Sequence, residues 1–345
     1  MNEFLAGIIK GISGIVGNYG WAMIIFTILV RLVLTPFDVK SRVGMRRMSA
    51  VQPKVAVLQK KYANDKDKLN AKTAELYKKE KVNPLTSCLP LLLTWPILIA
   101  VFAAMRMVAN EMMVDQVKAI LDGTTVHLDS WLWVKNVWMP DNIFSPSLPD
   151  LSTLQQIEAN IWTSSLFDAN GVCVCQALAP LNLTPASFDK SAVAATLQSI
   201  IDTMQASGKV VFEDGTVLPY LEAVAVMPGW KGAGFLGLFN FEVKSHWNGL
   251  LLLPILSAAS QLLMTKITGG QEQQPADPNQ PNTGKFMKWF FPIFSMVICL
   301  GYSAAFALYW VAGNLVSMAQ TVVINKVLDN KEKKQLEAAT EGSVK

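Results

Sequence analysis

The sequence predicts an all-α polytopic membrane protein, with five transmembrane helices around a hydrophilic groove, a cytoplasmic helical hairpin and a small α/β extracytoplasmic lobe. Of the 345 residues, 51% are hydrophobic and only 16% are charged, whereas an ordinary soluble domain carries about 25% charged residues. The apolar residues gather in five segments that approach the roughly 20 residues needed to cross a bilayer. Lys and Arg are distributed very unequally between the connecting segments, as in polytopic membrane proteins.

Composition also excludes several function classes. The formal net charge is only +4, which does not favour nucleic-acid binding. Two His and four scattered Cys leave little material for a metal site. We therefore expect no His/Cys metal site.

The first predicted element is an interfacial amphipathic helix over residues 1–19. Phe4, Ile8, Ile12 and Ile15 recur at helical spacing, which is typical of a helix that lies on a membrane surface. The alternative is a flexible leader without regular structure. No cationic stretch precedes a cleavable apolar region, so a conventional signal peptide is not expected.

Five apolar segments follow as predicted transmembrane helices: 20–37, 84–109, 246–267, 286–301 and 304–325. Only Tyr302 and Ser303 separate the last two, which predicts an antiparallel hairpin. Trp21, Trp247 and Trp289 lie near segment ends, where amphipathic rings favour the membrane interface.

Loop charge predicts the orientation. Residues 38–83 contain thirteen Lys and Arg against five Asp and Glu, a net +8, and 110–245 contain six Lys against fourteen acids, a net −8. The positive-inside rule places 38–83 in the cytoplasm and 110–245 outside. Five spans then put the N-terminus outside and the C-terminus inside, and the basic tail over 326–345 agrees.

The basic segment 38–83 is predicted to form a helical hairpin. Met48, Val51, Val55 and Leu58 form an apolar seam on a charged helix. Asn64 and Asp65 offer a turn and an N-cap before a second helix. Its lysines are either a solvated face or a contact for anionic headgroups, ribosomal RNA or a nascent chain. The candidate contact residues are Arg42, Met45, Arg46, Arg47 and Met48.

The outer segment 110–245 is expected to carry the small lobe over about 145–240. Residues 191–205 predict a helix, and residues 209–218 predict a β-hairpin whose Asp214-Gly215 pair favours a type I′ turn. Cys173 and Cys175 are either a redox or metal pair, or thiols without function. The polar segment 268–285 is predicted to be a flexible cytoplasmic linker.

Arg31 is the most informative side chain. It lies about six residues, or roughly 9 Å at 1.5 Å per residue, from the cytoplasmic end of the first span. A central arginine costs about 2.5–3.5 kcal/mol on insertion scales and stays protonated. It must snorkel, find an acidic partner or face water. Because none of the five spans contains Asp or Glu, we favour a hydrated groove or an anionic partner from outside the fold.

Polar residues within the spans are candidates to line this groove, although each alone is more often a helix–helix contact. The candidates are Thr27, Thr35, Thr94, Ser257, Ser260, Gln261, Asn314, Ser317 and Gln320. A transporter or channel is one alternative, although the membrane acids that transporters often need are missing from the spans. A membrane-anchored scaffold whose outer lobe does the work is another.

The order of these parts resembles the YidC/Oxa/Alb family of membrane protein insertases, in the bacterial short form without the large Gram-negative first periplasmic domain. The segments that carry the resemblance are IFTILVRLVLTPF at 25–37, NPLTSCLPLLLTWPILIA at 83–100, WLWVK at 131–135 and ALYWVAGNLVSMAQ at 307–320. The resemblance implies five helices around a groove that is open to cytoplasm and lipid. The outer loop is longer than the resemblance implies.

The resemblance also implies a function and partners. It implies an insertase and chaperone that inserts and helps to fold nascent membrane proteins through a hydrated groove, with no cofactor, no catalytic residue and no enzyme activity. Arg31 matches the groove arginine of the family, and Gln261 and Trp310 match groove-lining positions. The expected partners are nascent membrane proteins and membrane lipids, with the Sec translocon and the ribosome as further candidates. The expected location is the bacterial plasma membrane.

Overall fold

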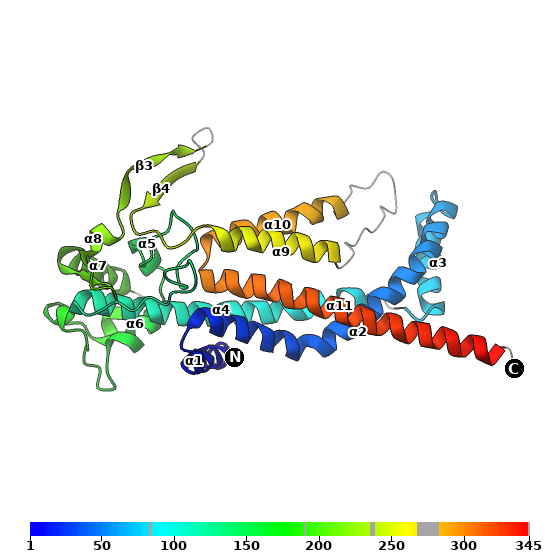
Figure 1. Ribbon diagram of the computed structural model, residues 1–345, viewed down its shortest axis with the longest axis horizontal. Helices are drawn as coiled ribbons and strands as arrows, with labels where there is room; N and C mark the ends of the chain where they lie inside the picture. Colours follow the sequence, from blue (N-terminus) through cyan, green and yellow to red (C-terminus); the bar gives the residue numbers. More distant parts are fainter. Residues whose placement is uncertain (83–84, 190, 235–238, 268–282, 344–345) are drawn as a thin grey trace. The chain divides into compact units, whose positions relative to one another are not determined.

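The computed structural model describes residues 1–82, 85–189, 191–234, 239–267 and 283–343 (Figure 1). Most of the described chain is helical. The long helices are α1 Asn2–Val16, α2 Tyr19–Lys61, α3 Lys66–Lys79, α4 Leu85–Asp122, α7 Val193–Ser207, α9 Leu252–Ile267, α10 Thr283–Gly301 and α11 Ala304–Ser343. The short helices are α5 Leu151–Leu154, α6 Ala159–Leu166, α8 Tyr220–Ala223 and the 3₁₀ turns Gln176–Leu181 and Pro185–Phe188. The strands are β1 Lys209–Val211, β2 Val217–Pro219, β3 Val226–Gly234 and β4 Phe239–Lys244.

Three described helical stretches are long and apolar enough to cross a membrane: Tyr19–Lys61, Pro96–Asp122 and Ala304–Lys331. Two further apolar helices, Leu252–Ile267 and Lys288–Gly301, are shorter. The prediction of a largely helical membrane protein with a small amount of sheet is therefore confirmed. The count of five crossings stays a prediction.

The chain divides into two compact units, which we describe separately. Unit 1 comprises Met1–Phe26, Ala100–Ser257 and Ser295–Trp310, and unit 2 comprises Thr27–Ile99, Ala258–Phe294 and Val311–Lys345. The predicted outer lobe belongs to unit 1, and Arg31 and the predicted basic hairpin belong to unit 2.

The core of unit 1 is apolar and aromatic. Trp162, Leu178, Ile200 and Tyr220 are almost fully buried, and the hydroxyl of Tyr220 donates to the Pro149 carbonyl at 2.8 Å. Full burial of such a side chain contributes about 1.5–3 kcal/mol. The predicted helix over 191–205 is confirmed as α7, which presents an apolar face to this core.

The predicted β-hairpin is also confirmed, because β1 pairs antiparallel with β2. The predicted type I′ turn is wrong, because that turn needs positive φ at both central residues. Among the described residues only Gly215 of the pair has positive φ, at 85°. Phe212 and Thr216 close a three-residue loop, in which Gly215 N–H donates to the Phe212 carbonyl at 3.0 Å and Phe212 N–H donates to the Thr216 carbonyl at 2.8 Å.

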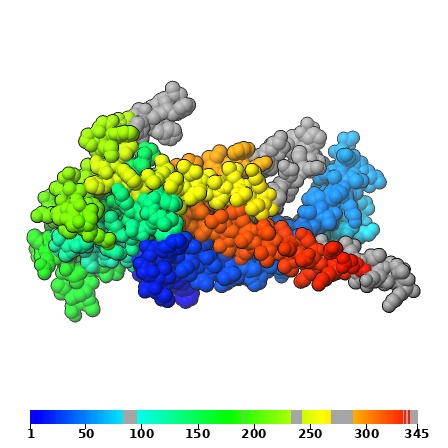
Figure 2. Space-filling view, in the orientation of Figure 1, coloured from blue at the N-terminus to red at the C-terminus, as the bar shows by residue number. Residues whose placement is uncertain are grey.

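The predicted helical hairpin in unit 2 is formed by the second half of α2 and by α3, whose atoms lie together in Figure 2. Asp65 is the N-cap of α3 and accepts from the Lys68 backbone N–H at 3.0 Å. Lys54 on α2 pairs with Glu80 at 2.6 Å. Val51 and Val55 of the apolar seam are buried.

Several helix boundaries differ from the sequence prediction. Helix α2 continues from the predicted first span into the hairpin without a break, with Pro36 and Pro53 inside it. Helix α4 continues past residue 109 to Asp122, because Met113, Val117 and Ile120 extend its buried face. The N-terminal helix is confirmed as α1, and its place at an interface stays a prediction. The predicted linker over 268–285 lies largely outside the described residues.

Candidate functional site

Arg31 lies on α2 with its guanidinium against the backbone of α11. A Cβ atom built at Gly313 would lie 3.2 Å from Nη2 and 3.5 Å from Nε of Arg31, and 3.7 Å from Cγ2 of Thr27. Arg31 is half-buried, whereas Thr27 is fully buried. The positive charge therefore lies where a side chain of α11 would otherwise be.

The backbone of Arg31 is tied to the same helix. Its carbonyl accepts from the Gln320 side-chain amide at 3.1 Å and from the Thr35 hydroxyl at 3.0 Å. Gln320 Nε2 also donates to Thr35 Oγ1 at 2.7 Å. These bonds join α2 to α11 one to two turns from the guanidinium, so the structure brings together Arg31, Thr35 and Gln320 as a polar group.

A second polar group joins α9 to α11. Asn314 Nδ2 donates to Ser260 Oγ at 3.0 Å and to Gln261 Oε1 at 3.1 Å. Since Asn314 follows Gly313 directly, α11 presents adjacent residues to the α2 and α9 polar groups. An amide bonded within a helical bundle also stabilises packing, so these contacts fit either a groove lining or a helix contact.

The other predicted groove residues are more scattered. Ser257 belongs to unit 1, where its buried hydroxyl donates to the Pro254 carbonyl at 2.7 Å. Trp310, also in unit 1, is half-buried beside Phe306 with ring centroids 5.8 Å apart. Its Nε1 has no hydrogen-bond partner among the described residues. Ser317 is buried in unit 2, and the side chain of Thr94 lies outside the described part.

Basic residues farther along α2 contact the second half of α11. Arg42 Nη2 donates to Thr321 Oγ1 at 2.5 Å. Arg46 donates from Nη2 to the side chain and carbonyl of Asn325, each at 3.2 Å, and pairs from Nη1 with Asp329 at 2.7 Å. Two of the predicted hairpin contact residues are therefore used within the chain.

The remaining hairpin candidates differ in exposure. Arg47 is exposed, whereas Met45 and Met48 are half-buried. This leaves Arg47 as the most accessible arginine of the predicted contact set.

Arg31 is less isolated than its span suggests. Asp38 interacts electrostatically with Arg31 and with Arg42. Seven residues separate Arg31 from Asp38, or about 10 Å along a helix, and none of the ion pairs found in the described part includes Arg31. The nearest carboxylate on the same helix is therefore about two turns from Arg31 along α2 and forms no ion pair with it in the described part of the chain.

Buried polar side chains organise the segment of unit 1 that precedes α9. Asn248 is fully buried, and its Nδ2 donates to the carbonyls of Asn136, Met139 and Pro140 at 2.9–3.0 Å. Its Oδ1 accepts from Asn136 N–H at 2.8 Å. One side chain therefore satisfies four backbone groups of a segment without regular structure.

Asp141 bonds to the start of α9, although the two lie far apart in the sequence. Its carboxylate accepts from the backbone N–H groups of Leu250 at 2.8 Å and Leu253 at 2.6 Å, and from Trp133 Nε1 at 3.1 Å. A carboxylate at a helix N-terminus satisfies orphan donors and complements the helix dipole. Gly249 allows this approach, because a Cβ there would overlap the carboxylate.

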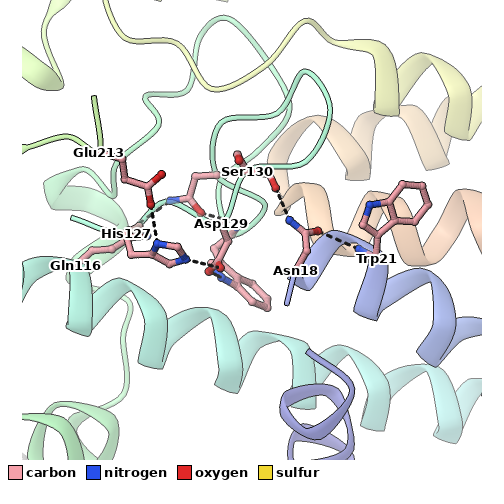
Figure 3. Close-up of polar contacts among 9 residues, drawn as sticks. Asn18, Trp21, Gln116, His127, Asp129, Ser130 and Glu213 are labelled. Atoms are coloured by element: carbon pink, nitrogen blue, oxygen red, sulfur yellow. Dashed lines mark hydrogen bonds and ion pairs between the residues drawn. The ribbon is translucent and has the colours of Figure 1, made fainter. Parts of the chain in front are cut away.

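Figure 3 shows a further polar cluster of unit 1. His127 lies 2.6 Å from Glu213 and 3.6 Å from Asp129, and Asn18 Nδ2 donates to the Ser130 carbonyl at 2.7 Å. Burial raises the pKa of Asp129, although the hydrogen bond from Trp138 opposes this shift. These contacts link the β1–β2 loop and the start of α2 to residues 127–130.

The cysteines of the lobe are free thiols. Cys175 Sγ lies 3.4 Å from Asp122 Oδ1, and burial, with a smaller effect of Asp122, raises the pKa of its thiol to about 12. Because the thiolate is the reactive form, this environment does not favour redox or metal chemistry at Cys175. The described residues contain no cluster of three or more His, Cys, Asp or Glu that could hold a metal ion.

The comparison with known families identifies the family of this chain. The model of the 60Kd inner membrane protein family matches residues 11–188 and 216–333. The chain belongs to this family. The expected relation to the YidC-type insertases is confirmed at the level of the family.

Several relatives in the family carry the name membrane protein insertase YidC. The chain is 44% identical to the protein of Fusobacterium nucleatum over 106 residues, which are 31% of this chain and 52% of the relative. It is 37% identical to that of Clostridium tetani over 147 residues, 41% of this chain and 60% of the relative. It is 42% identical to that of Caldanaerobacter subterraneus over 103 residues, 30% of this chain and 50% of the relative. The matched part therefore spans about half to three fifths of these relatives.

The two ranges matched by the family model leave out residues 189–215. This stretch contains α7 and β1, so the part of the outer loop that the family model does not match includes folded elements. Sequence reasoning also missed Gly313. An isolated glycine inside an apolar helix was the available signal, since glycine there costs about 1 kcal/mol relative to alanine.

Proposed function

We propose that this chain is a membrane protein insertase and chaperone, in which Arg31 receives acidic or polar segments of nascent membrane proteins. The carrying observation is the half-buried Arg31 guanidinium, which lies against α11 and has no ion-pair partner in the described part of the chain. The 60Kd inner membrane protein family and its relatives named YidC support the same role.

The proposed mechanism needs neither a nucleotide nor a covalent intermediate. The hydrophilic outer segment of a substrate enters a hydrated groove, where its carboxylates are attracted to Arg31. The apolar segment of the substrate then moves into lipid, so less polar surface crosses hydrocarbon at one time. The proposed lining within unit 2 is Thr27, Thr35, Thr94, Gln261, Asn314 and Ser317.

The proposed setting is the bacterial plasma membrane, with the basic hairpin and the C-terminus in the cytoplasm. The net +8 of residues 38–83 and the net −8 of residues 110–245 support this topology. Arg47 is the exposed arginine available for lipid headgroups, a ribosome or a nascent chain. Action beside the Sec translocon belongs to the same proposal.

The test is insertion into liposomes that contain the purified full chain, followed by protease protection. Two matched substrates are compared. One carries an acidic outer tail, and the other carries the same tail with each Asp and Glu replaced by Asn and Gln. We expect Arg31→Ala to lower the initial rate for the acidic substrate by about tenfold, which corresponds to about 1.4 kcal/mol. Arg31→Lys should retain part of the rate, since it keeps the charge.

Arg106→Ala is the matched control, because Arg106 is exposed and bonds only the Gln156 carbonyl, at 3.4 Å, among its described partners. Equal insertion of both substrates by wild type and Arg31→Ala would refute the electrostatic role. Solute flux through the same liposomes without insertion would favour a transporter. A chain lacking 145–240 that folds but loses all insertion would favour a lobe-based function.

A further inference from the structure

Gly313 is the glycine of α11 whose missing side chain makes room for a charged group. The residue is buried, and a Cβ there would lie 3.2 Å from Arg31 Nη2. Few real Cβ contacts are that close, so even alanine requires its neighbours to move. Gly7, Gly11 and Gly14 of α1 differ, because a Cβ at any of them meets no atom within 4 Å.

The surrounding bonds decide what would move. Gln320 Nε2 donates to the Arg31 carbonyl at 3.1 Å and to Thr35 Oγ1 at 2.7 Å, so α2 and α11 are joined about two turns along α11 from the glycine. The guanidinium ends a flexible side chain, whereas these contacts involve the backbone of α2. A larger residue at 313 would therefore displace the guanidinium before it separated the helices.

We propose that Gly313 is a positioning residue: it forms a notch in α11 that sets where the Arg31 charge lies, and so sets the preference for acidic substrate segments. The second part rests on the proposed insertase function. The first part concerns the chain alone and has its own measurement.

That measurement is nitrogen-15 NMR of arginine side chains in the detergent-solubilised full chain. The sequence has five arginines, and Arg31→Lys identifies the Arg31 Nε–H signal by its loss. We expect Gly313→Ala to shift this signal and Gly313→Val to shift it further, with the other four signals unchanged. Ala319→Val is the matched control, since Ala319 is an exposed residue of the same helix.

An unmoved Arg31 signal in folded Gly313→Ala or Gly313→Val would overturn the proposal. If Gly313→Val does not fold, as judged by gel filtration, the graded pair becomes Gly313→Ala and Gly313→Ser. A shift of all five signals would also overturn it, because the substitution would then disturb the whole bundle rather than one guanidinium.

The link to substrate choice is tested by a double-mutant cycle in the insertion assay. Gly313→Val should lower insertion of the acidic substrate by about threefold or more and have no further effect in an Arg31→Ala background. Equal loss in both backgrounds would show a packing role instead and would overturn this part. If the NMR signal shifts while Arg31→Ala inserts acidic substrates normally, the positioning role of Gly313 is supported and the proposed function of Arg31 is refuted.

Discussion

At the scale of the residue, Arg31 and Asn248 show two ways in which a polar side chain is accommodated inside the packed structure. The guanidinium of Arg31 keeps its charge and lies against the Gly313 backbone, with Asp38 two turns away along α2. Asn248 is neutral, and all of its polar atoms are bonded to backbone groups. The first arrangement leaves a charge without an ion pair among the described residues, whereas the second satisfies backbone groups within the fold.

Removing the Asn248 side chain should therefore destabilise unit 1. In Asn248→Ala, the Asn136 N–H loses its acceptor, and the carbonyls of Asn136, Met139 and Pro140 each lose one of their two donors. A buried polar group left unpaired, such as this N–H, costs about 1–3 kcal/mol. We expect a melting temperature several degrees lower in detergent, measured by tryptophan fluorescence. Asn170→Ala is the control, because Asn170 is exposed, and an equal fall in both variants would contradict the assigned role.

At the scale of the element, helix ends are held by side chains whose charge state matters. Asp150 is the N-cap of α5 and accepts from Thr153 N–H at 2.9 Å, Thr153 Oγ1 at 2.7 Å and Ser152 Oγ at 2.8 Å. Burial raises the pKa of this carboxyl, but the hydrogen bonds outweigh burial and the net pKa is lowered. The ionised form is thus the one that the folded state favours.

The sign of the pH effect follows from this lowered pKa. The ionised Asp150 carboxylate stabilises the folded state fully at pH values above the unfolded pKa of about 3.9. This stabilisation is lost as the pH falls through the lower pKa of the folded state. We expect Asp150→Asn to differ most from wild type at neutral pH and to converge with it at the acid end. Thermal melts from pH 7 down to about pH 2 measure the difference. A difference that grows on acidification would contradict the assignment.

The contact between α2 and the end of α11 is a second feature at this scale. Arg46 bonds Asn325 and Asp329, while its neighbour Arg47 is exposed. Because an exposed ion pair contributes only about 0–1 kcal/mol, Arg46→Ala should leave global stability nearly unchanged. It should raise amide hydrogen exchange around 322–331 by about threefold. Arg47→Ala is the matched control, and equal protection in both variants would count against this contact.

At the scale of the whole molecule, the distribution of charge predicts the topology. Ala71 lies on the exposed surface of α3, and Ala169 lies exposed in the lobe. In a chain whose native cysteines are replaced by serine, a membrane-impermeant maleimide should label Ala169→Cys in intact cells. It should label Ala71→Cys only after permeabilisation. The reverse pattern would mean that the charge asymmetry does not govern insertion of this chain.

Local signals in the sequence predicted many elements of the fold. Apolar residues at helical spacing located α1, and Asp65 located the start of α3. The Asp-Gly pair located the β1–β2 hairpin, although the turn type was wrong. Helix ends were harder to predict, because the buried face of α4 continues past its apolar stretch and because α2 continues through Pro36.

By itself, the sequence determined the membrane class, the charge asymmetry, the family and the choice of Arg31, since each depends on composition or local order along the chain. Only the tertiary structure placed Gly313 against Arg31 and joined Gln320 to its carbonyl. It also showed that Arg42 and Arg46 are engaged by α11 and that Ser257 and Trp310 belong to the other unit. These contacts are between residues far apart in the chain. They depend on how the helices pack together, which the periodicity of a single helix does not reveal.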